Sequence, residues 1–408
     1  MVSVKLRATT WMLCAIGLGS VPVAASAESW VGIWQTAPTN PVEGLPVEIA
    51  PAPKTVRGTL IYLIRPTLSG EAVRLRLSNE VGTQPLKIGS VSITAGEGKG
   101  RPVPVTFNGT KSVEIPAGAP ILSDPISFDA RYDKVLLVSV YLPEGYVAAQ
   151  STSIGPTRYV ADHDVTGSPD FAAAEPISAR PIVSAIAVRA PKAARAIVTL
   201  GDSITDGTTA PLTAIRGWPD VLAERLRANR KASPLAVMNA GIAGNRLLHD
   251  GMGVSALARF DRDVLAVPGV THVLLLEGIN DIGFSGLQMG PVKNPTVNSQ
   301  MIIGAYRQII DRAHARGLKI IGGTLLPFRG AFYFSEEKER IRQEVNAWIR
   351  SSGAFDGVVD FDKAMRDEVR PDTLKANADS GDHLHPNVAG HQMMAEAVDI
   401  RLFDQSVP

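Results

Sequence analysis

From residue 195 onward, short apolar runs alternate with stretches that have helical periodicity. Strands that are apolar throughout and separated by helices are typical of a parallel sheet covered on both faces. The pattern therefore predicts an α/β fold built on a five-stranded parallel sheet. The expected strands are 196–200, 235–239, 273–276, 319–324 and 357–360, and the expected helices are 218–229, 254–264, 301–316, 336–350 and 387–403.

The first of these strands leads into a segment that suggests catalysis. Residues 199–207 are Thr-Leu-Gly-Asp-Ser-Ile-Thr-Asp-Gly, a strand followed by residues that favour turns and helix starts. A hydroxyl at a helix N-terminus lies near unpaired backbone N–H groups and the positive end of the helix dipole, which favour the anion formed during acyl transfer. Ser203 is therefore a candidate nucleophile. The alternative is that Ser203 only caps the helix.

The other groups that a nucleophilic serine needs are a base, an orienting carboxylate and donors for the oxyanion. Candidates for all of them occur downstream. Residues 239–245 (Asn-Ala-Gly-Ile-Ala-Gly-Asn) follow the second strand, residues 277–281 (Glu-Gly-Ile-Asn-Asp) follow the third, and residues 382–387 (Asp-His-Leu-His-Pro-Asn) lie near the C-terminus. Ligands bind beyond the carboxyl ends of strands in such sheets, and Ser203, Gly244 and Asn280 all follow strands, so these three residues are expected to lie together there.

These blocks resemble those of the SGNH (GDSL-type) hydrolases. The family's blocks centre on a Ser in Gly-Asp-Ser, a Gly, an Asn in Gly-x-Asn-Asp and a His in Asp-x-x-His-Pro. All occur here in the family's order, with small departures: Ile204 replaces the family's leucine, and His383 is an additional histidine in the last block. The corresponding positions are Ser203, Gly244, Asn280, Asp382 and His385.

The resemblance implies a flavodoxin-like domain with a serine-esterase mechanism. Ser203 would attack an ester carbonyl, His385 would transfer the proton, and Asp382 would orient the imidazole. Backbone N–H groups of Ser203 and Gly244, with the Asn280 side-chain amide, would form the oxyanion hole.

Several of these residues have simpler interpretations. Gly244 alone would indicate only a tight turn. Asn280 and Asp281 could cap the helix that follows them, with Asp281 the better candidate. His383 is the fallback base. Asp382 with the two nearby histidines is also a plausible metal ligand set, but no further His or Cys cluster accompanies it.

No cofactor is expected, because the chain has neither a Walker A motif nor a dinucleotide-binding glycine pattern. No metal is expected either. A G-x-S-x-G elbow is absent, which disfavours the α/β-hydrolase fold. The remaining histidines are expected to be structural or exposed; they are His163, His249, His272, His314 and His391.

Residues 28–190 have short alternating apolar runs separated by Gly- and Pro-rich turns, which predicts an all-β sandwich or jelly-roll-like domain. Residues 76–82 (Arg-Leu-Ser-Asn-Glu-Val-Gly) resemble the β domain that precedes the catalytic domain in some exported SGNH hydrolases. Arg76, Asn79 and Glu80 are expected to close a turn, the alternative being a substrate-facing loop. The boundary is expected near residues 190–194, with the catalytic domain at 195–408.

The first 27 residues have the features of a secretory signal. Lys5 and Arg7 precede an apolar core at 11–18, and Ala25-Ser26-Ala27 matches a cleavage site. The core is shorter than the ~20 residues of a spanning helix, so we expect cleavage near Ala27, a secreted or periplasmic location and no stable membrane insertion. Cys14, the only cysteine, would be removed, leaving no thiol for a disulfide.

The sequence thus predicts an exported esterase for short-chain carboxylic esters, with O-acetyl groups on carbohydrates as candidate substrates. The 41 basic and 40 acidic residues give no electrostatic argument for nucleic-acid binding. Two alternatives stay open: an acyltransferase on the same fold, and a carbohydrate-binding protein with an inactive hydrolase domain. The intact set of five candidate residues argues against the second.

Overall fold

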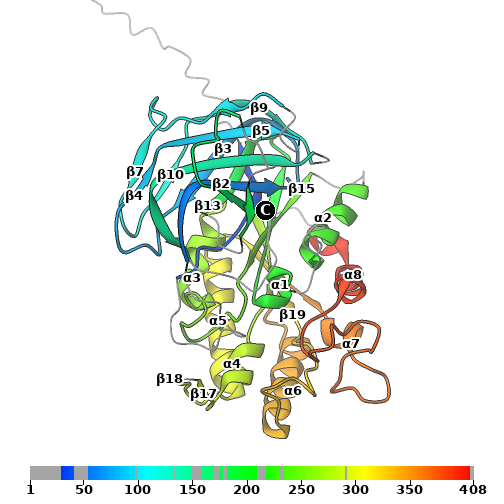
Figure 1. The fold of residues 1–408 in the computed structure, drawn as a ribbon. Coiled ribbons are helices and arrows are strands. Elements are labelled where there is room, and N and C mark those ends of the chain that lie inside the picture. Colours follow the sequence, from blue (N-terminus) through cyan, green and yellow to red (C-terminus); the bar gives the residue numbers. More distant parts are fainter. Residues whose placement is uncertain are drawn as a thin grey trace, which may run out of the picture.

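A computed structural model describes residues 29–40, 54–96, 100–132, 134–148, 158–168, 174–177, 182–208, 217–229, 234–289 and 292–404. The expected signal segment, residues 1–27, lies outside these ranges. Figure 1 shows a β-rich part above a part in which strands and helices alternate.

The β-rich part is an antiparallel sandwich, as predicted, and its described residues include no helix. Its two sheets share one core, formed by residues such as Leu75, Ile93 and Val138, all fully buried. The first sheet contains β1 (Trp30–Gln35), β13 (Val183–Arg189), β3 (Gly70–Ser78) and β8 (Pro120–Leu122) in that order, with β9 (Ile126–Ala130) also on β3. The second contains β12 (Glu175–Pro176), β11 (Arg158–Ala161), β2 (Lys54–Ile64), β10 (Leu136–Ala148), β5 (Ser90–Ala95) and β6 (Val103–Pro104), and β4 (Leu86–Ile88) pairs separately with β7 (Val113–Ile115).

The segment 76–82 closes a turn in this sandwich. The side-chain amide of Asn79 is buried and donates to the carbonyl groups of Gln84 and Ile115 at 2.8 and 3.0 Å. Arg76 pairs with Glu80 at 2.7 Å. These contacts support the structural interpretation of the segment.

The C-terminal part contains the predicted five-stranded parallel sheet. The strand order places the first strand of this part second in the sheet, which is the flavodoxin-like arrangement. In spatial order the strands are β15 (Leu235–Gly241), β14 (Arg195–Gly201), β16 (Val270–Leu276), β19 (Lys319–Gly323) and β20 (Gly357–Val359). The division into domains at residues 190–194, which connect β13 to β14, stays a prediction.

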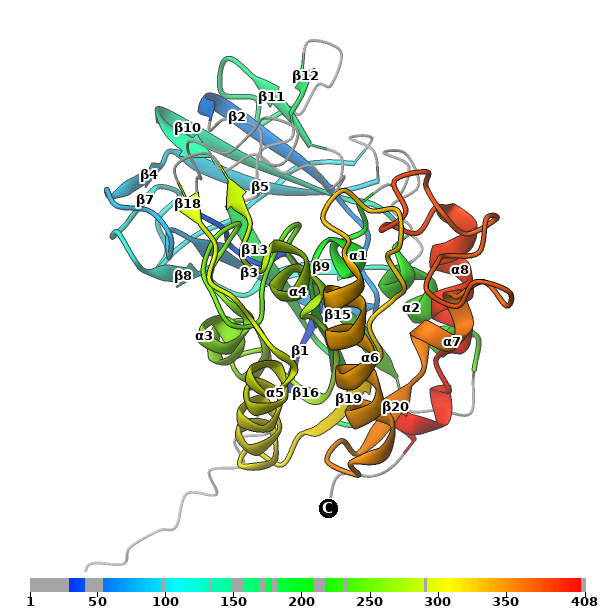
Figure 2. The same ribbon diagram turned by 90° about the horizontal axis from the view of Figure 1, so that it is seen from below.

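Helices cover both faces of this sheet, as the view from below shows (Figure 2). One face carries α2 (Trp218–Ala228) and α8 (Val388–Ala397), and the other carries α3 (Ala256–Phe260), α5 (Ser299–His314) and α6 (Glu336–Ser351). The sequence of α5 illustrates why: Ile302, Tyr306, Ile309 and Ala313 recur on one buried face. Shorter elements are α1 (Ser203–Asp206), α4 (Ile279–Phe284), α7 (Phe361–Met365) and the β17–β18 hairpin (Gln288–Met289, Val292–Lys293).

Two predicted helices differ from the structure. The helix expected at 254–264 is the short α3 followed by a π-helical turn, η1 (Asp261–Leu265), in which the Ala266 N–H bonds the Asp261 carbonyl. The helix expected at 387–403 ends after α8, because Val398 is extended and Asp399 starts a separate 3₁₀ turn, η2 (Ile400–Phe403). Periodicity continues through both breaks, so the sequence pattern did not reveal them.

Strand β1 joins the two parts by packing on β15. Gly32 donates its backbone N–H to Pro268 O at 2.9 Å, and Gln35 donates its side-chain amide to Asp263 O at 2.8 Å. The Thr67 hydroxyl also bonds Val237 O at 3.1 Å. Both parts therefore contribute to one continuous junction.

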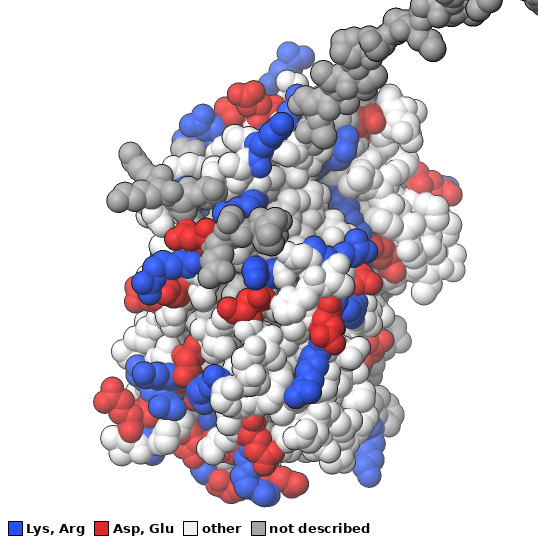
Figure 3. Space-filling model, turned by 180° about the vertical axis from the view of Figure 1, so that it is seen from behind, with Lys and Arg blue, Asp and Glu red and all other residues white. Residues whose placement is uncertain are grey.

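No helix among the described residues is long and apolar enough to cross a membrane. On the face shown in Figure 3, basic and acidic side chains are intermixed, without a large area of one sign. This agrees with the nearly balanced charge of the sequence.

Candidate active site

Ser203 lies at the first position of α1, directly beyond the carboxyl end of β14. Asp202, not Ser203, caps this helix, because its side chain accepts a 2.9 Å hydrogen bond from the Ile204 N–H. The interpretation of Ser203 as the cap is therefore wrong. Its hydroxyl is left for another partner.

That partner is His385. The Ser203 Oγ and His385 Nε2 atoms are 2.7 Å apart, and the other ring nitrogen, Nδ1, is 2.5 Å from Asp382 Oδ2. The backbone N–H groups of Leu384 and His385 donate to Asp382 Oδ1 at 3.0 and 2.8 Å. This local turn holds the carboxylate next to a ring only three residues away.

The environment of Asp382 favours its ionised form. Partial burial alone would raise the pKa of this carboxyl. The hydrogen bond to His385, the charge of that ring and the bonds from the Leu384 and His385 amides outweigh burial, and they hold the pKa of Asp382 well below its usual range. Asp382 is thus a permanently charged partner for the ring near neutral pH.

The second histidine of this block has a different partner. The His383 Nδ1 atom lies 2.7 Å from Asp379 Oδ2, and about half of the His383 side chain is exposed. Its backbone has a φ of 62°, so the chain turns sharply between the two rings. The structure brings His385 to Ser203 and leaves His383 outside the pair.

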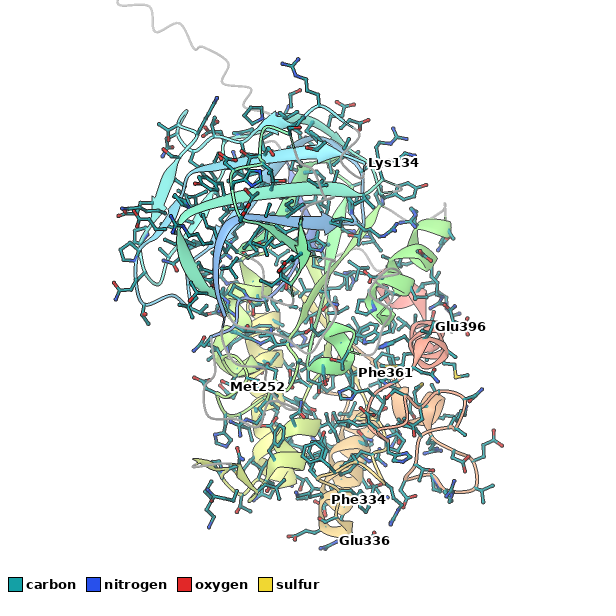
Figure 4. All side chains as sticks on the ribbon, in the orientation of Figure 1. Lys134, Met252, Phe334, Glu336, Phe361 and Glu396 are labelled. Carbon is teal, nitrogen blue, oxygen red and sulfur yellow. The ribbon has the colours of Figure 1, made fainter. Side chains whose placement is uncertain are left out.

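Gly244 lies in the loop after β15, with a φ of 70°. A Cβ atom there would come within 1.5 Å of Met252 Cε, so the Met252 side chain packs directly on the glycine. Figure 4 labels Met252, which lies in the part of the molecule below the sandwich. Within the described residues, neither the Ser203 nor the Gly244 backbone N–H donates a hydrogen bond. Both groups are therefore available as donors.

Asn280 is nearly fully buried in α4, and both ends of its side-chain amide are held. Its Nδ2 donates to Asn245 O at 3.0 Å, beside Gly244, and its Oδ1 accepts from the Tyr333 hydroxyl at 3.3 Å. One N–H of the amide is used on Asn245, which leaves the second for a ligand. Tyr333 has no signal in the sequence motifs that would have identified it.

Asp281 does not cap α4, so the simpler interpretation of this residue is wrong. Gly278 occupies the cap position, and Asp281 lies inside the helix. Its carboxylate accepts from the backbone N–H groups of Leu247 and Leu248 at 2.6 and 2.9 Å. Asp281 therefore fixes the loop that carries Gly244 against the helix that carries Asn280.

Arg259 holds together the backbone beneath the site. This role was not predicted from the sequence. It is 1% exposed, and its guanidinium donates to Gly201 O, Ala240 O and Asn245 Oδ1 at 3.0, 2.6 and 2.9 Å. It thus joins the ends of β14 and β15 to the loop after β15. Its position in a stretch of helical periodicity gave no sign of this role.

Buried carboxyl groups lie close to this arginine. Glu277 is wholly buried, 3.7 Å from an Arg259 nitrogen, and neither carboxyl oxygen has a hydrogen-bond partner in the described part of the chain. Burial, with the nearby Asp202, raises the pKa of Glu277 well above its usual value. Burial also raises the pKa of Asp202 to about 7 and that of Asp281 to about 6.

Four of the five other histidines are structural or exposed, as expected; the fifth, His249, is partly buried, and its Nε2 atom has no hydrogen-bond partner in the described part of the chain. His272 and His391 are buried, and burial lowers the pKa of each to about 4. His314 pairs with Asp356 at 2.9 Å, and His163 lies at the surface. Among the described residues, no group of three His, Cys, Asp or Glu side chains is arranged to hold a metal ion.

Comparison with known proteins gives a match for the region that contains these residues. Residues 199–393 match the model of the GDSL-like lipase/acylhydrolase family. No curated protein matches the chain.

Similar solved structures cover about half of the chain. One is an acetylxylan esterase from Geobacillus stearothermophilus, 23% identical over 52% of this chain and 95% of that one, with a TM-score of 0.40. Another is a lipolytic protein of the G-D-S-L family from Desulfitobacterium hafniense, with 20% identity, coverage of 50% and 96%, and a TM-score of 0.38. A GDSL-like lipase from Bacteroides thetaiotaomicron has 19% identity, coverage of 51% and 88%, and a TM-score of 0.38.

Proposed function

We propose that the protein is a serine esterase for short-chain carboxylic esters, because residues 199–393 match the model of the GDSL-like lipase/acylhydrolase family. The observation that carries the proposal is the chain of contacts from Ser203 through His385 to Asp382, at 2.7 and 2.5 Å. Both distances are short enough for the hydrogen bonds that join a nucleophile to its base and the base to its orienting carboxylate.

In the proposed reaction the Ser203 Oγ attacks the ester carbonyl carbon while His385 Nε2 accepts the hydroxyl proton. The carbonyl oxygen becomes an anion near the N–H groups of Ser203 and Gly244 and the Asn280 amide. His385 then gives its proton to the departing alkoxide, which leaves as the alcohol. Water, deprotonated by the same ring, attacks the acyl-enzyme and releases the acid, and the proton returns to Ser203.

The packing around the proposed oxyanion donors supports a small acyl group. Met252 packs directly on Gly244, and Tyr333 lies against both Asn280 and Gly283, where a Cβ atom would come within 2.5 Å of its ring. Side chains therefore occupy the space beside two of the three donors. An acetyl group needs less room there than a long acyl chain.

The side of the site near His385 supports a bulky alcohol, and we propose O-acetyl groups on carbohydrates as substrates. Nearly half of the Asp382 side chain is exposed, as is about half of His383. Phe332, which is 69% exposed, lies in the loop between β19 and α6. This loop approaches His383 at Gly330 and Asn280 at Tyr333, so an exposed ring lies next to the proposed site. The signal-like residues 1–27 support a secreted or periplasmic location, where such glycans are found.

The proposal is tested by hydrolysis of chromogenic esters with acyl chains from acetate to decanoate. The parent should prefer acetate, and Ser203→Ala and His385→Ala should each lose at least about 1000-fold in kcat/KM. His383→Ala is the matched control and should retain most activity. An inactive parent, or full activity in Ser203→Ala, would refute the esterase proposal.

The carbohydrate part is tested separately with acetylated xylooligosaccharides. Acetate release that saturates at lower substrate concentration than with a chromogenic acetate would support a sugar-binding contribution. Adding an unacetylated sugar acceptor distinguishes hydrolysis from acyl transfer, because a transferase would form new ester faster than free acid.

A further inference from the structure

A cavity of about 470 Å³ lies at the junction between the sandwich and the parallel sheet. It is bounded by β1, β3, β8 and β13 on one side and by β15, η1 and the residues after η1 on the other. None of the proposed catalytic or oxyanion residues lines it. Its volume is within the range of small-molecule sites.

Most of the cavity wall is apolar. The Trp30 ring and the side chains of Ile186, Met238 and Val267 contribute to it. Leu122, which is 56% exposed, lies among the lining residues as well. A ligand that fills this space must therefore have an apolar body.

Charged side chains interrupt the apolar wall: the three arginines Arg74, Arg76 and Arg262, and one carboxylate, Asp263. Arg76 is neutralised by Glu80 at 2.7 Å. Arg262 binds Asp263 at 2.6 Å, but Asp263 also binds the buried Arg259 at 3.0 Å. Asp263 is thus shared between two guanidinium groups. With Arg74, the lining carries more positive than negative charge.

The side chain of Arg74 has no ion pair or hydrogen bond with any residue in the described ranges. Its guanidinium lies 4.6 Å above the centre of the Trp30 ring, a cation–π contact that leaves the positive charge uncompensated. The charge of Arg74 helps to lower the pKa of Asp124. The Asp124 carboxylate nevertheless accepts its hydrogen bonds from Thr106, Asn108 and Gly109 and not from Arg74. Arg74 therefore remains available to an anion.

We propose that this cavity is a binding site for a small amphiphilic carboxylate, that is, an acid with an aliphatic chain or an aromatic ring. Its carboxylate would bind Arg74, since guanidinium groups match carboxylates in geometry and charge. Its apolar body would lie against Trp30, Ile186 and Met238. A neutral polar ligand such as a sugar does not fit, because the wall offers few uncharged polar groups.

The test uses the full-length protein and isothermal titration with three probes, with decanoate kept below its micelle concentration and decan-1-ol below its solubility limit. Decanoate has both the charge and the tail, decan-1-ol has only the tail, and acetate has only the charge. We expect decanoate to bind about tenfold or more tightly than decan-1-ol, and acetate to give no measurable binding. Equal binding of decanoate and decan-1-ol would overturn the role of the arginine.

Two variants locate the binding. Arg74→Gln and Leu122→Glu should each weaken decanoate binding about tenfold or more, the first by removing the cation and the second by adding a negative charge at an exposed position of the wall. Arg101→Gln, an exposed arginine outside the cavity, should bind like the parent. Unchanged affinity in both cavity variants, or no decanoate binding by the parent, would refute the proposal.

This test is independent of the esterase proposal because it measures binding rather than turnover. Both cavity variants should keep the parent's rate on a chromogenic acetate, whatever that rate is. Decanoate held as a product at Ser203 would bind equally to the parent and to Arg74→Gln, which is a refuting result.

Discussion

The Tyr333 hydroxyl donates to the Asn280 side-chain oxygen over 3.3 Å, between residues 53 positions apart in the chain. An asparagine amide can face either way, and its orientation is decided by its hydrogen-bond partners. Here the hydroxyl of Tyr333 holds the oxygen, so the Nδ2 group faces Asn245 O and the proposed oxyanion position. Tyr333 is thus a positioning residue for one of the proposed donors.

Tyr333→Phe should lower kcat about tenfold and leave KM nearly unchanged, because the amide loses orientation at the charged transition state and not at substrate binding. Steady-state kinetics on a chromogenic acetate measures both parameters. Tyr306→Phe is the matched control: Tyr306 is equally buried but donates to Glu277 O at 2.6 Å and not to the amide. A similar loss of kcat in both variants would indicate a general structural effect.

Asp382→Asn should reduce kcat by about 100-fold or more, since the amide cannot stabilise the charged ring and favours the wrong tautomer. Its fold should persist, because asparagine can still accept the backbone bonds of Leu384 and His385. Asp379→Asn removes the equivalent charge next to His383 and should change kcat little. Comparable losses in the two variants would argue against His385 as the base.

Gly244→Ala should destabilise the protein for two separable reasons. The positive φ of 70° strains any L-residue, and the new methyl group would collide with Met252. Gly118→Ala is the control for strain alone, because Gly118 has a φ of 75° and a Cβ atom added there would have no other atom within 4 Å. Urea denaturation should give about 1 kcal/mol of destabilisation for Gly118→Ala and at least about 1 kcal/mol more for Gly244→Ala. Equal values would show that Met252 moves aside freely.

Local sequence signals predicted the strands and the positions of the candidate residues, because both depend on short-range patterns. An apolar run followed by Gly-Asp-Ser places Ser203 at a strand end, whatever the rest of the chain does. Arg259 and Tyr333 were not predictable in this way, since each acts through partners from distant segments. The sequence also favoured His385 over His383 only through the family's Pro386. In the structure, His383 does not contact Ser203 because the carboxylate of Asp379 binds its ring.

The buried Asp202 makes stability depend on pH. Its folded-state pKa of about 7 lies above the ordinary aspartate value of 3.8. Between these values the unfolded chain loses a proton that the folded protein keeps, so the free energy of unfolding should fall as pH rises from about 4 to 7. Glu277, whose pKa is also raised by burial, acts in the same direction.

Asp202→Asn should make this pH dependence shallower, because asparagine is as good an N-cap for α1 but has no charge to bury. Each unit of pKa difference corresponds to about 1.4 kcal/mol, so the variant should retain about 2 kcal/mol or more of the stability that the parent loses. Urea denaturation at intervals from pH 4 to 8 measures this. Asp399→Asn is the matched control: Asp399 also caps a helical turn, but its hydrogen bonds to Arg401 lower its pKa to about 2. Above about pH 5 it is ionised in both states, so its removal should leave the slope unchanged there. An unchanged slope in Asp202→Asn would mean that Asp202 ionises normally in the folded protein.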